Sequence, residues 1–587
     1  MAPLFEFIEF PESSGRECQQ LSLSQYRPMI FRSRTYRFFA ALALGLATTF
    51  LVALPLRAAE QVVLEFGPFS RAIPTESLVN FAATGTVDRQ LAPFLRRLNP
   101  AQIGGLQAIL SRSRAVQVVP ISQWFNSPMG DRSLQFLGKV AQTEAGLNGG
   151  KALRAAIVAA ATEDGEISLI DIVRHFPTGE MRLNVSQAMA LARQVRAEAA
   201  ATGAIAAAIE QQSQAEAAQP PPLDLAALPD LTQPGPYGSR QISLTLVDAE
   251  RNRTYPADVF IPQNLPGSGP IPVIVISHGL GDSRTTFFGL AAHAASHGFA
   301  VALPDHIGSN STQKQAMLTG LDSETFKARD FLDRPLDISF LLDELDRLNG
   351  STFGGRLDVS RVAAVGHSFG GYTALAVGGA KIDFERLAQR CDPAANLLID
   401  AAMVLECRAL ELRDDEAVMA RLAQGTQDDR VQLVMAFAPV SNLFGPRGLA
   451  DVAVPVMLLG GEVDLLAPVV PQQVAAFSWL RGRDRYLYLG ENTSHGPDFT
   501  KLFARFLYLD AGLEQGIDEA IATTQGVNRS LVVAFGQVYL AQREDYRPFL
   551  RSAYVETVSA DPFRLHLVRD LPPAVVERLG SGQPGLE

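Results

Sequence analysis

The 587-residue sequence has little cysteine and no excess of basic charge. Three cysteines are too few for a disulfide-rich scaffold or for a zinc module with several cysteine ligands. Lys and Arg number 51 against 62 Asp and Glu, a net charge of −11, and this balance argues against a nucleic-acid partner. Gly (47) and Pro (36) are also fewer than in low-complexity disordered chains. What remains is a globular chain, 47% hydrophobic and long enough for two to three domains.

One long hydrophobic run lies near the N-terminus, at residues 38–56, after four arginines within residues 27–37. A basic segment, an apolar run and small residues at Ala58-Ala59 predict that residues 1–59 are an extension and a secretory signal. The alternative is a membrane anchor formed by residues 38–56, since about 19 apolar residues approach the length of a membrane span. We expect an exported protein, in periplasm, lumen or medium, and Met29 as the physiological start. A precursor beginning at Met1 would contradict that start.

The rest of the chain changes pattern twice. Residues 60–218 predict a mostly helical domain of unknown role, opened by a small hairpin at residues 61–74. Residues 219–238 are rich in proline and predict a linker. In residues 239–587, apolar runs alternate with helical stretches, which predicts an α/β domain with a mostly parallel sheet and helices on both faces. The expected strands include residues 242–247, 255–261, 273–277, 299–303, 362–365, 431–437, 454–459 and 486–489.

The sequence Gly366-His367-Ser368-Phe369-Gly370-Gly371 matches the G-x-S-x-G nucleophile elbow. A strand-like run precedes it, and a helix-like stretch begins at Tyr372. Glycines are needed on both sides of such a turn, because side chains there would clash with the neighbouring strand and helix. We therefore predict Ser368 as a nucleophile.

A serine nucleophile needs a general base, and the base needs an acid that orients it. With this elbow, the chain order is Ser, then Asp or Glu, then His. His495 lies in a loop after a strand-like run and is the predicted base, whereas His566 is expected to be a surface or packing residue. Asp464 lies in the loop past another strand and is the predicted acid, with Glu462 as the alternative. The remaining nearby acids are expected in solvated loops: Asp451, Asp484 and Glu491.

Acyl transfer also needs N–H donors for the developing oxyanion. The backbone N–H of Phe369 is one predicted donor, and that of Leu280, in the Gly-rich loop after an early strand, is the other. His278, in the same loop, is predicted to be structural, and a direct catalytic role is the less favoured alternative.

Two patterns imitate cofactor sites. Gly279-x-Gly281-x-x-Arg284 resembles a dinucleotide fingerprint, but its third glycine is an arginine. His293 and His297 have the spacing of zinc ligands on a helix, but residue 294 is alanine where a zinc protease has its glutamate, and no third ligand is evident. We expect no metal and no organic cofactor.

About 50 residues, 381–430, separate the helix of the elbow from the next strand, which is long for a simple crossover. We predict a cap insertion that forms an acyl-binding lid, with an ordinary packing helix as the alternative. Cys391 and Cys407 lie in this insertion, and the sequence leaves open whether they form a disulfide or stay as buried thiols.

The stretch SHGLGDSRTTFFGLAAHAASHGFAVALPDH, together with GHSFGG, resembles the platelet-activating-factor acetylhydrolase group of α/β-hydrolases and the dienelactone-hydrolase-related esterases. The resemblance covers roughly residues 240–500 and implies an α/β-hydrolase fold with Leu280 and Phe369 as oxyanion donors. Those acetylhydrolases carry their acid after the strand that follows the elbow helix. Here that place, residues 436–440, has no carboxylate, which supports Asp464 from the later strand. Dienelactone hydrolases use a cysteine nucleophile, where this chain has Ser368.

The region from EFGPFSRAIPTESLVNFAATGTV to IVRHFPTGEMRL resembles an uncharacterised helical domain fused to such hydrolases in cyanobacterial proteins. Together these features predict an exported serine hydrolase that cleaves carboxylic esters, of lipid type with a short to medium acyl chain. Its partner would be a small-molecule or lipid ester substrate, with membrane-surface contact left open and the oligomeric state not predicted. The alternatives are a peptidase or acyltransferase on the same triad, or an envelope binding protein with a vestigial hydrolase fold.

Overall fold

The computed structural model describes residues 58–392, 401–501 and 514–580. All but the last two residues of the predicted signal (1–59), its alternative as an anchor and both candidate start residues lie outside this part of the chain. Within it, no helix combines the length and the apolar character that a membrane crossing needs. The chain divides into two compact units, Met1–Val118 with Leu137–Val185, and Val119–Phe136 with Ser186–Glu587. The domain limits expected from sequence, 60–218 and 239–587, stay predictions.

The first unit combines short helices with a small sheet of strand order β2-β1-β6-β4. The expected hairpin is present, because β1 pairs antiparallel with β2 around Gly67, whose φ is +58°. Strand β6 then pairs parallel with β1, a long-range contact that the sequence did not predict. The elements are β1 Gln61–Phe66, β2 Phe69–Pro74, α2 Thr75–Thr84, α3 Ala92–Leu95, α4 Pro100–Ser111, β3 Arg114–Ala115, β4 Ala141–Gln142, α7 Gly150–Asp164, β5 Glu166–Ile167, α8 Leu169–Arg174 and β6 Glu180–Asn184.

The second unit contains a nine-stranded sheet of order β15-β14-β13-β12-β11-β9-β10-β8-β7. The strands from β14 to β10 are parallel, while β8, β7 and β15 pair antiparallel at the two edges. The strands are β7 Gly238–Asp248, β8 Arg253–Gln263, β9 Ile271–Ser277, β10 Ala300–Pro304, β11 Leu357–His367, β12 Val431–Phe437, β13 Val456–Gly461, β14 Arg485–Gly490 and β15 Leu565–Val568. The first eight correspond to the expected strand runs, whereas β15 was not predicted.

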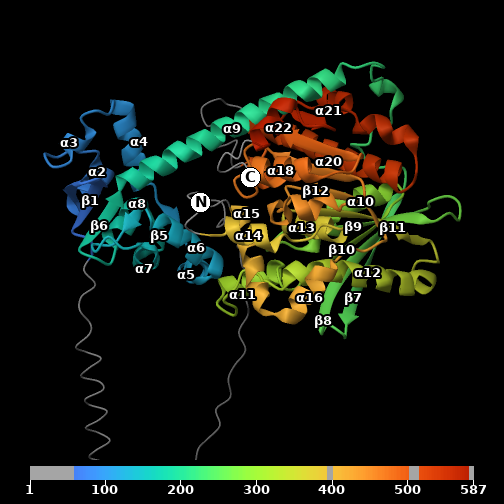
Figure 1. The fold of residues 1–587 in the computed structure, drawn as a ribbon, viewed down its shortest axis with the longest axis horizontal. Helices are drawn as coiled ribbons and strands as arrows, with labels where there is room; N and C mark the ends of the chain where they lie inside the picture. The colour runs from blue at the N-terminus through green and yellow to red at the C-terminus, as the bar shows by residue number, and fades with distance from the viewer. Residues whose placement is uncertain (1–57, 393–400, 502–513, 581–587) are drawn as a thin grey trace, which may run out of the picture. The chain divides into compact units, whose positions relative to one another are not determined.

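Helices cover both faces of this sheet, as the continuous apolar runs predicted (Figure 1). Along β9, Val273 and Val275 belong to one buried cluster, with α12 (Asp330–Thr352) and α13 (Phe369–Val377). The alternate residues, Ile274 and Ile276, belong to a second cluster with α10 (Phe288–Ser296) and α20 (Glu514–Tyr539). A strand buried on both faces has no polar side to alternate with, so its sequence reads as an unbroken apolar run.

The insertion between α13 and β12 is helical over most of its described residues and contains a disulfide between Cys391 and Cys407. The bridge decides between the two states that the sequence left open. The insertion comprises α14 Phe384–Arg390, α15 Ala401–Glu406, η3 Cys407–Asp414 and α16 Glu416–Gln424. Other helices of the second unit include α9 Val185–Ala217, α11 Ser311–Leu318, α17 Gly445–Ala450, α18 Ala475–Trp479, α21 Ser552–Val558 and α22 Pro573–Gly580.

Candidate active site

Ser368 occupies a strained turn between β11 and α13. Its φ and ψ are 57° and −119°, a region that residues with a side chain rarely adopt and that costs about 1–3 kcal/mol. The turn is held by neighbouring backbone, since the Ser368 N–H donates to the Phe437 carbonyl (2.8 Å) and the Ser368 carbonyl accepts from the Val440 N–H (3.3 Å). Such strain, maintained by the β12 loop, is typical of functional sites.

The glycines of the motif leave no room for side chains. A Cβ atom on Gly366 would lie 2.0 Å from the Gly370 carbonyl oxygen, and one on Gly370 would lie 2.0 Å from the Ser277 carbonyl oxygen. A Cβ on Gly371 would lie 2.7 Å from the Cβ of Pro439. The sharp turn therefore depends on close packing of the elbow against β9 and the β12 loop, which is the physical reason for its sequence pattern.

His495 and Asp464 form a buried pair. His495 Nδ1 lies 2.8 Å from Asp464 Oδ2, and the two residues are 7% and 3% exposed. The other carboxylate oxygen, Oδ1, accepts the N–H groups of Leu466 (2.8 Å) and Ala467 (2.9 Å). The carboxylate is thus fixed by its own loop after β13, and it presents one oxygen to the imidazole after β14.

The pair lies beside the elbow. His367, the residue before Ser368, donates from Nε2 to the His495 carbonyl (2.6 Å), and the two imidazole rings are 4.8 Å apart. Burial, and then the charge of His495, lower the pKa of His367 to about 4, so His367 is neutral near pH 7. A neutral His367 brings no like charge to a base that must itself accept a proton.

The hydrogen bond between serine and histidine that completes a catalytic triad is not formed. Among the described residues, neither the Ser368 hydroxyl nor His495 Nε2 has a hydrogen-bond partner within the chain. Both groups are therefore free to engage a substrate or each other, and catalytic hydrogen bonds are often long without substrate and tighten when it binds.

The loop after β9 lies against the nucleophile. A Cβ atom on Gly279 would lie 3.5 Å from the Cβ of Ser368, so the backbone passes close to the serine only because residue 279 is glycine. In the described part of the chain, the N–H groups of Leu280 and Phe369 donate to no acceptor. The sequence predicted these two as oxyanion donors, and the structure places both next to Ser368 with their donors unused.

His278 and Glu462, the alternative catalytic residues, make hydrogen bonds outside the His495–Asp464 pair. His278 is fully buried, donates from Nδ1 to the Gly279 carbonyl (2.8 Å) and accepts at Nε2 from the His306 N–H (3.0 Å). Burial is the largest of several causes that lower its pKa well below the ordinary value. Glu462, the alternative acid, accepts from the Asn492 N–H (3.2 Å) and not from His495. These contacts support structural roles for both.

His566 was predicted to be a surface or packing residue, and the structure buries it between two carboxylates. It is fully buried, and its two ring nitrogens lie 2.8 Å from Glu556 and 2.8 Å from Glu491. Burial alone would lower the pKa of His566, but the hydrogen bonds and charges of the two carboxylates raise it. Glu491 was expected in a solvated loop, and pairing between β15 and β14, which the sequence did not reveal, brings it to His566.

The described residues contain one group whose ligand atoms lie close enough to hold a metal, namely Glu210, Glu491 and His566. His566 Nδ1 contacts Glu556 and Nε2 contacts Glu491, so both ring nitrogens have carboxylate partners. The residues of the two patterns that imitate cofactor sites also have partners within the protein. His293 and His297 each bond a backbone carbonyl, and Arg284 pairs with Asp258 and Asp305.

Two family models match the chain. One, described as an alpha/beta hydrolase of unknown function (DUF1400), matches residues 58–184. The other, described as the alpha/beta hydrolase fold, matches residues 272–383, which include the Gly279 loop and the elbow. With the nine-stranded, mostly parallel sheet and its two helical layers, the second match shows that this unit has the α/β-hydrolase fold, as the sequence predicted. Both matches support a hydrolase.

Proposed function

We propose that this protein is a serine hydrolase that cleaves carboxylic esters through an acyl-enzyme. The observation that carries the proposal is the strained Ser368 turn, with the buried His495–Asp464 pair beside its His367 and unused backbone N–H donors at Phe369 and in the adjacent Gly279 loop. These are the three parts that acyl transfer to a serine requires. The acetylhydrolase-like motifs of the sequence favour an ester over an amide.

In this mechanism, Ser368 Oγ attacks the ester carbonyl carbon while its proton passes to His495 Nε2. The carbonyl oxygen becomes an oxyanion that accepts from the N–H groups of Leu280 and Phe369. The C–O bond then breaks, and His495 gives its proton to the leaving alcohol. Water, deprotonated by His495, attacks the acyl-enzyme, and the carboxylic acid leaves while Ser368 regains its proton.

The acetylhydrolase-like motifs of the sequence favour a lipid-type acyl chain of short to medium length, and two features of the structure concern the apolar surroundings of the site. Leu465, directly after Asp464, is 69% exposed and gives the triad loop an apolar side chain toward solvent. In the insertion, Arg408 stacks over Phe326 at 4.6 Å, and Phe326 packs edge-on against Phe369 at 5.5 Å. The insertion thus contacts the elbow through the ring of Phe326, and we propose that it covers the acyl chain as a lid.

The proposal extends to export, for which the disulfide is the supporting observation. Disulfides persist in oxidising compartments and are rare in the cytosol. Cys391–Cys407 therefore agrees with a signal in residues 1–59. Amino-terminal sequencing of the protein recovered outside the cytoplasm tests this part, and a mature N-terminus at Met1 or Met29 would contradict cleavage.

Hydrolysis of p-nitrophenyl esters from acetate to palmitate tests the chemistry. We expect turnover that is abolished in Ser368→Ala and preserved in Ser360→Ala, a matched change of an exposed serine on β11, the strand that leads to the turn. The best chain length measures the acyl site. No turnover on any ester with a verified fold would refute the proposal and leave peptide cleavage, acyl transfer or binding without catalysis.

A further inference from the structure

Arg334, on α12, is a fully buried cation directly behind the proposed active site. Its guanidinium donates to the carbonyl oxygen of His278 and lies over the ring of Phe369, 4.5 Å from the ring centre. Burying a cation is costly unless its contacts compensate. The burial of this cation therefore needs an explanation.

These two contacts involve the chain segments that carry the two proposed oxyanion donors. The His278 carbonyl belongs to the peptide that leads through Gly279 to the Leu280 N–H. Phe369 itself carries the second N–H, and its buried ring fixes how the first turn of α13 sits behind Ser368. One side chain thus restrains the β9 loop and the elbow helix, which come from distant parts of the sequence.

Ion pairing does not explain the position of Arg334. Its Nε and Nη1 groups have no hydrogen-bond partner among the described residues, and its Nη2 group donates there to the His278 carbonyl oxygen. Burial lowers the pKa of Arg334 to about 10, while the charges of Asp330 and Asp337 oppose that change. The guanidinium is therefore still charged at neutral pH.

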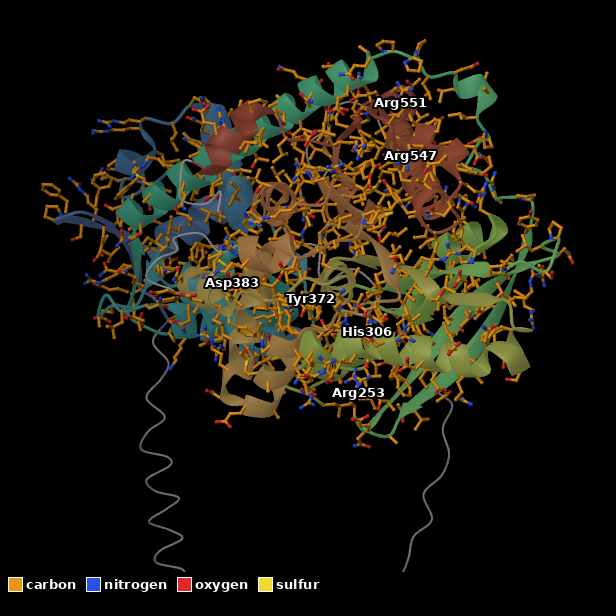
Figure 2. The ribbon with its side chains drawn as sticks, turned by 45° about the vertical axis from the view of Figure 1, so that its right-hand side comes forward. Arg253, His306, Tyr372, Asp383, Arg547 and Arg551 are labelled. Atoms are coloured by element: carbon orange, nitrogen blue, oxygen red, sulfur yellow. A yellow bond between two sulfur atoms is a disulfide. The ribbon has the colours of Figure 1, made fainter. Side chains whose placement is uncertain are left out.

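Arg253 provides the contrast within the same region, where Figure 2 labels it together with His306 and Tyr372. Its guanidinium binds both oxygens of Asp337 (2.9 and 2.8 Å) and one oxygen of Asp333 (3.3 Å). Arg253 is thus a buried arginine held by carboxylates, and it has no hydrogen bond to His278 and no ring contact with Phe369 within the described chain.

We propose that Arg334 is a positioning residue that holds the Leu280 and Phe369 N–H groups at the spacing the oxyanion needs. The inference rests on the proposed ester hydrolysis at Ser368 and adds to it the device that preorganises the oxyanion site. Donors fixed in advance stabilise the charge that develops on the substrate oxygen without reorganising during the reaction. Loss of Arg334 therefore weakens transition-state binding more than substrate binding.

Full-length wild type, Arg334→Met, Arg334→Lys and the matched control Arg253→Met test this role. Each is measured for Tm, for kcat and KM on the best p-nitrophenyl ester, and for inhibition by a trifluoromethyl ketone of the same chain length. In the inhibited complex, Ser368 Oγ adds to the ketone carbon, its proton passes to His495, and the ketone oxygen becomes the oxyanion. No group leaves, so inhibitor affinity reports the oxyanion site directly.

For Arg334→Met we expect kcat to fall about 10- to 100-fold, with KM nearly unchanged and ketone affinity reduced by a similar factor. The midpoint of the pH–rate profile should not shift, because the substitution leaves His495 and Asp464 unchanged. Arg334→Lys should lose less, since it keeps the charge but not the planar contact with Phe369. Arg253→Met should lower Tm but keep wild-type kcat and ketone affinity per folded molecule.

If Arg334→Met does not fold, Arg334→Lys compared with Arg253→Met decides the question by the same measurements. Wild-type kcat and ketone affinity in the folded Arg334 variants, or an equal loss in Arg253→Met, would overturn the positioning role. Absence of both turnover and ketone binding in wild type would instead overturn the proposed function, and this inference with it.

Discussion

Replacing Asp464 with asparagine tests the assigned acid most directly, because the structure fixes how the new side chain must lie. Asp464 Oδ1 accepts two backbone N–H groups, from Leu466 and Ala467. An amide NH2 cannot take that position, since it would face two donors. The asparagine oxygen therefore stays there, and the NH2 group points at His495 Nδ1, where Oδ2 now lies at 2.8 Å.

An NH2 group that donates to Nδ1 forces the histidine proton onto Nε2. That tautomer cannot accept the proton of Ser368, although the size and shape of the site are unchanged. We expect kcat to fall about 10⁴-fold, which corresponds to about 5 kcal/mol in the activation free energy. KM should change little, because the substrate contacts neither Asp464 nor Nδ1.

The assay is hydrolysis of the best p-nitrophenyl ester, with Tm measured to confirm an intact fold. Glu462→Gln is the matched control. It removes the neighbouring carboxylate, which accepts from Asn492, and should leave kcat unchanged. The reasoning would be refuted if Asp464→Asn kept more than about a tenth of wild-type kcat, or if Glu462→Gln caused the larger loss.

Three further predictions concern stability. Gly370→Ala should destabilise the fold by about 1–3 kcal/mol in urea unfolding, since its Cβ would lie 2.0 Å from the Ser277 oxygen. Gly289→Ala, in open space on a helix, should not, and equal midpoints for the two variants would contradict the packing argument. Reduction of Cys391–Cys407, 16 residues apart, should lower the unfolding free energy by about 3 kcal/mol, and an unchanged urea midpoint under reductant would refute this. The pKa of His566 is raised in the folded state, so its ion pairs stabilise the protein fully below the unfolded value of about 6.5 and lose that effect as pH rises through the folded value. The difference in Tm between wild type and His566→Gln should therefore shrink from pH 6 to pH 9, and a constant difference would contradict the ionic role.

The parts of the fold and site that the sequence predicted are those encoded locally. Ser368 lies in a contiguous motif, and buried parallel strands show as apolar runs, so the elbow and eight strands could be placed without a structure. Asp464 and His495 needed only the rule that triad residues follow strand ends, and the structure pairs them.

The features that the sequence did not reveal depend on contacts between distant residues. Strand β15 has four residues, too few for a clear pattern, and it is defined by pairing with β14 across 75 residues at the His566–Glu491 contact. Arg334 reads as an ordinary charged residue of an amphipathic helix. Its burial follows from α12 packing against the loop of His278, which no local spacing indicates.

Because the groups of the proposed site follow different strands of the sheet, the site assembles only when these strands pair. The proposed oxyanion loop, nucleophile, acid and base follow four different strands, β9, β11, β13 and β14, at residues 280, 368, 464 and 495. A growing chain that has not reached residue 495 lacks at least one of these groups. Pairing of distant strands is also a slow step in folding. Under the proposed mechanism, a chain in which these strands have not yet paired therefore carries Ser368 without the base, the acid and the oxyanion donors that would activate it. If the proposed hydrolysis needs all four groups, the first appearance of activity during refolding would mark completed strand pairing from β9 to β14.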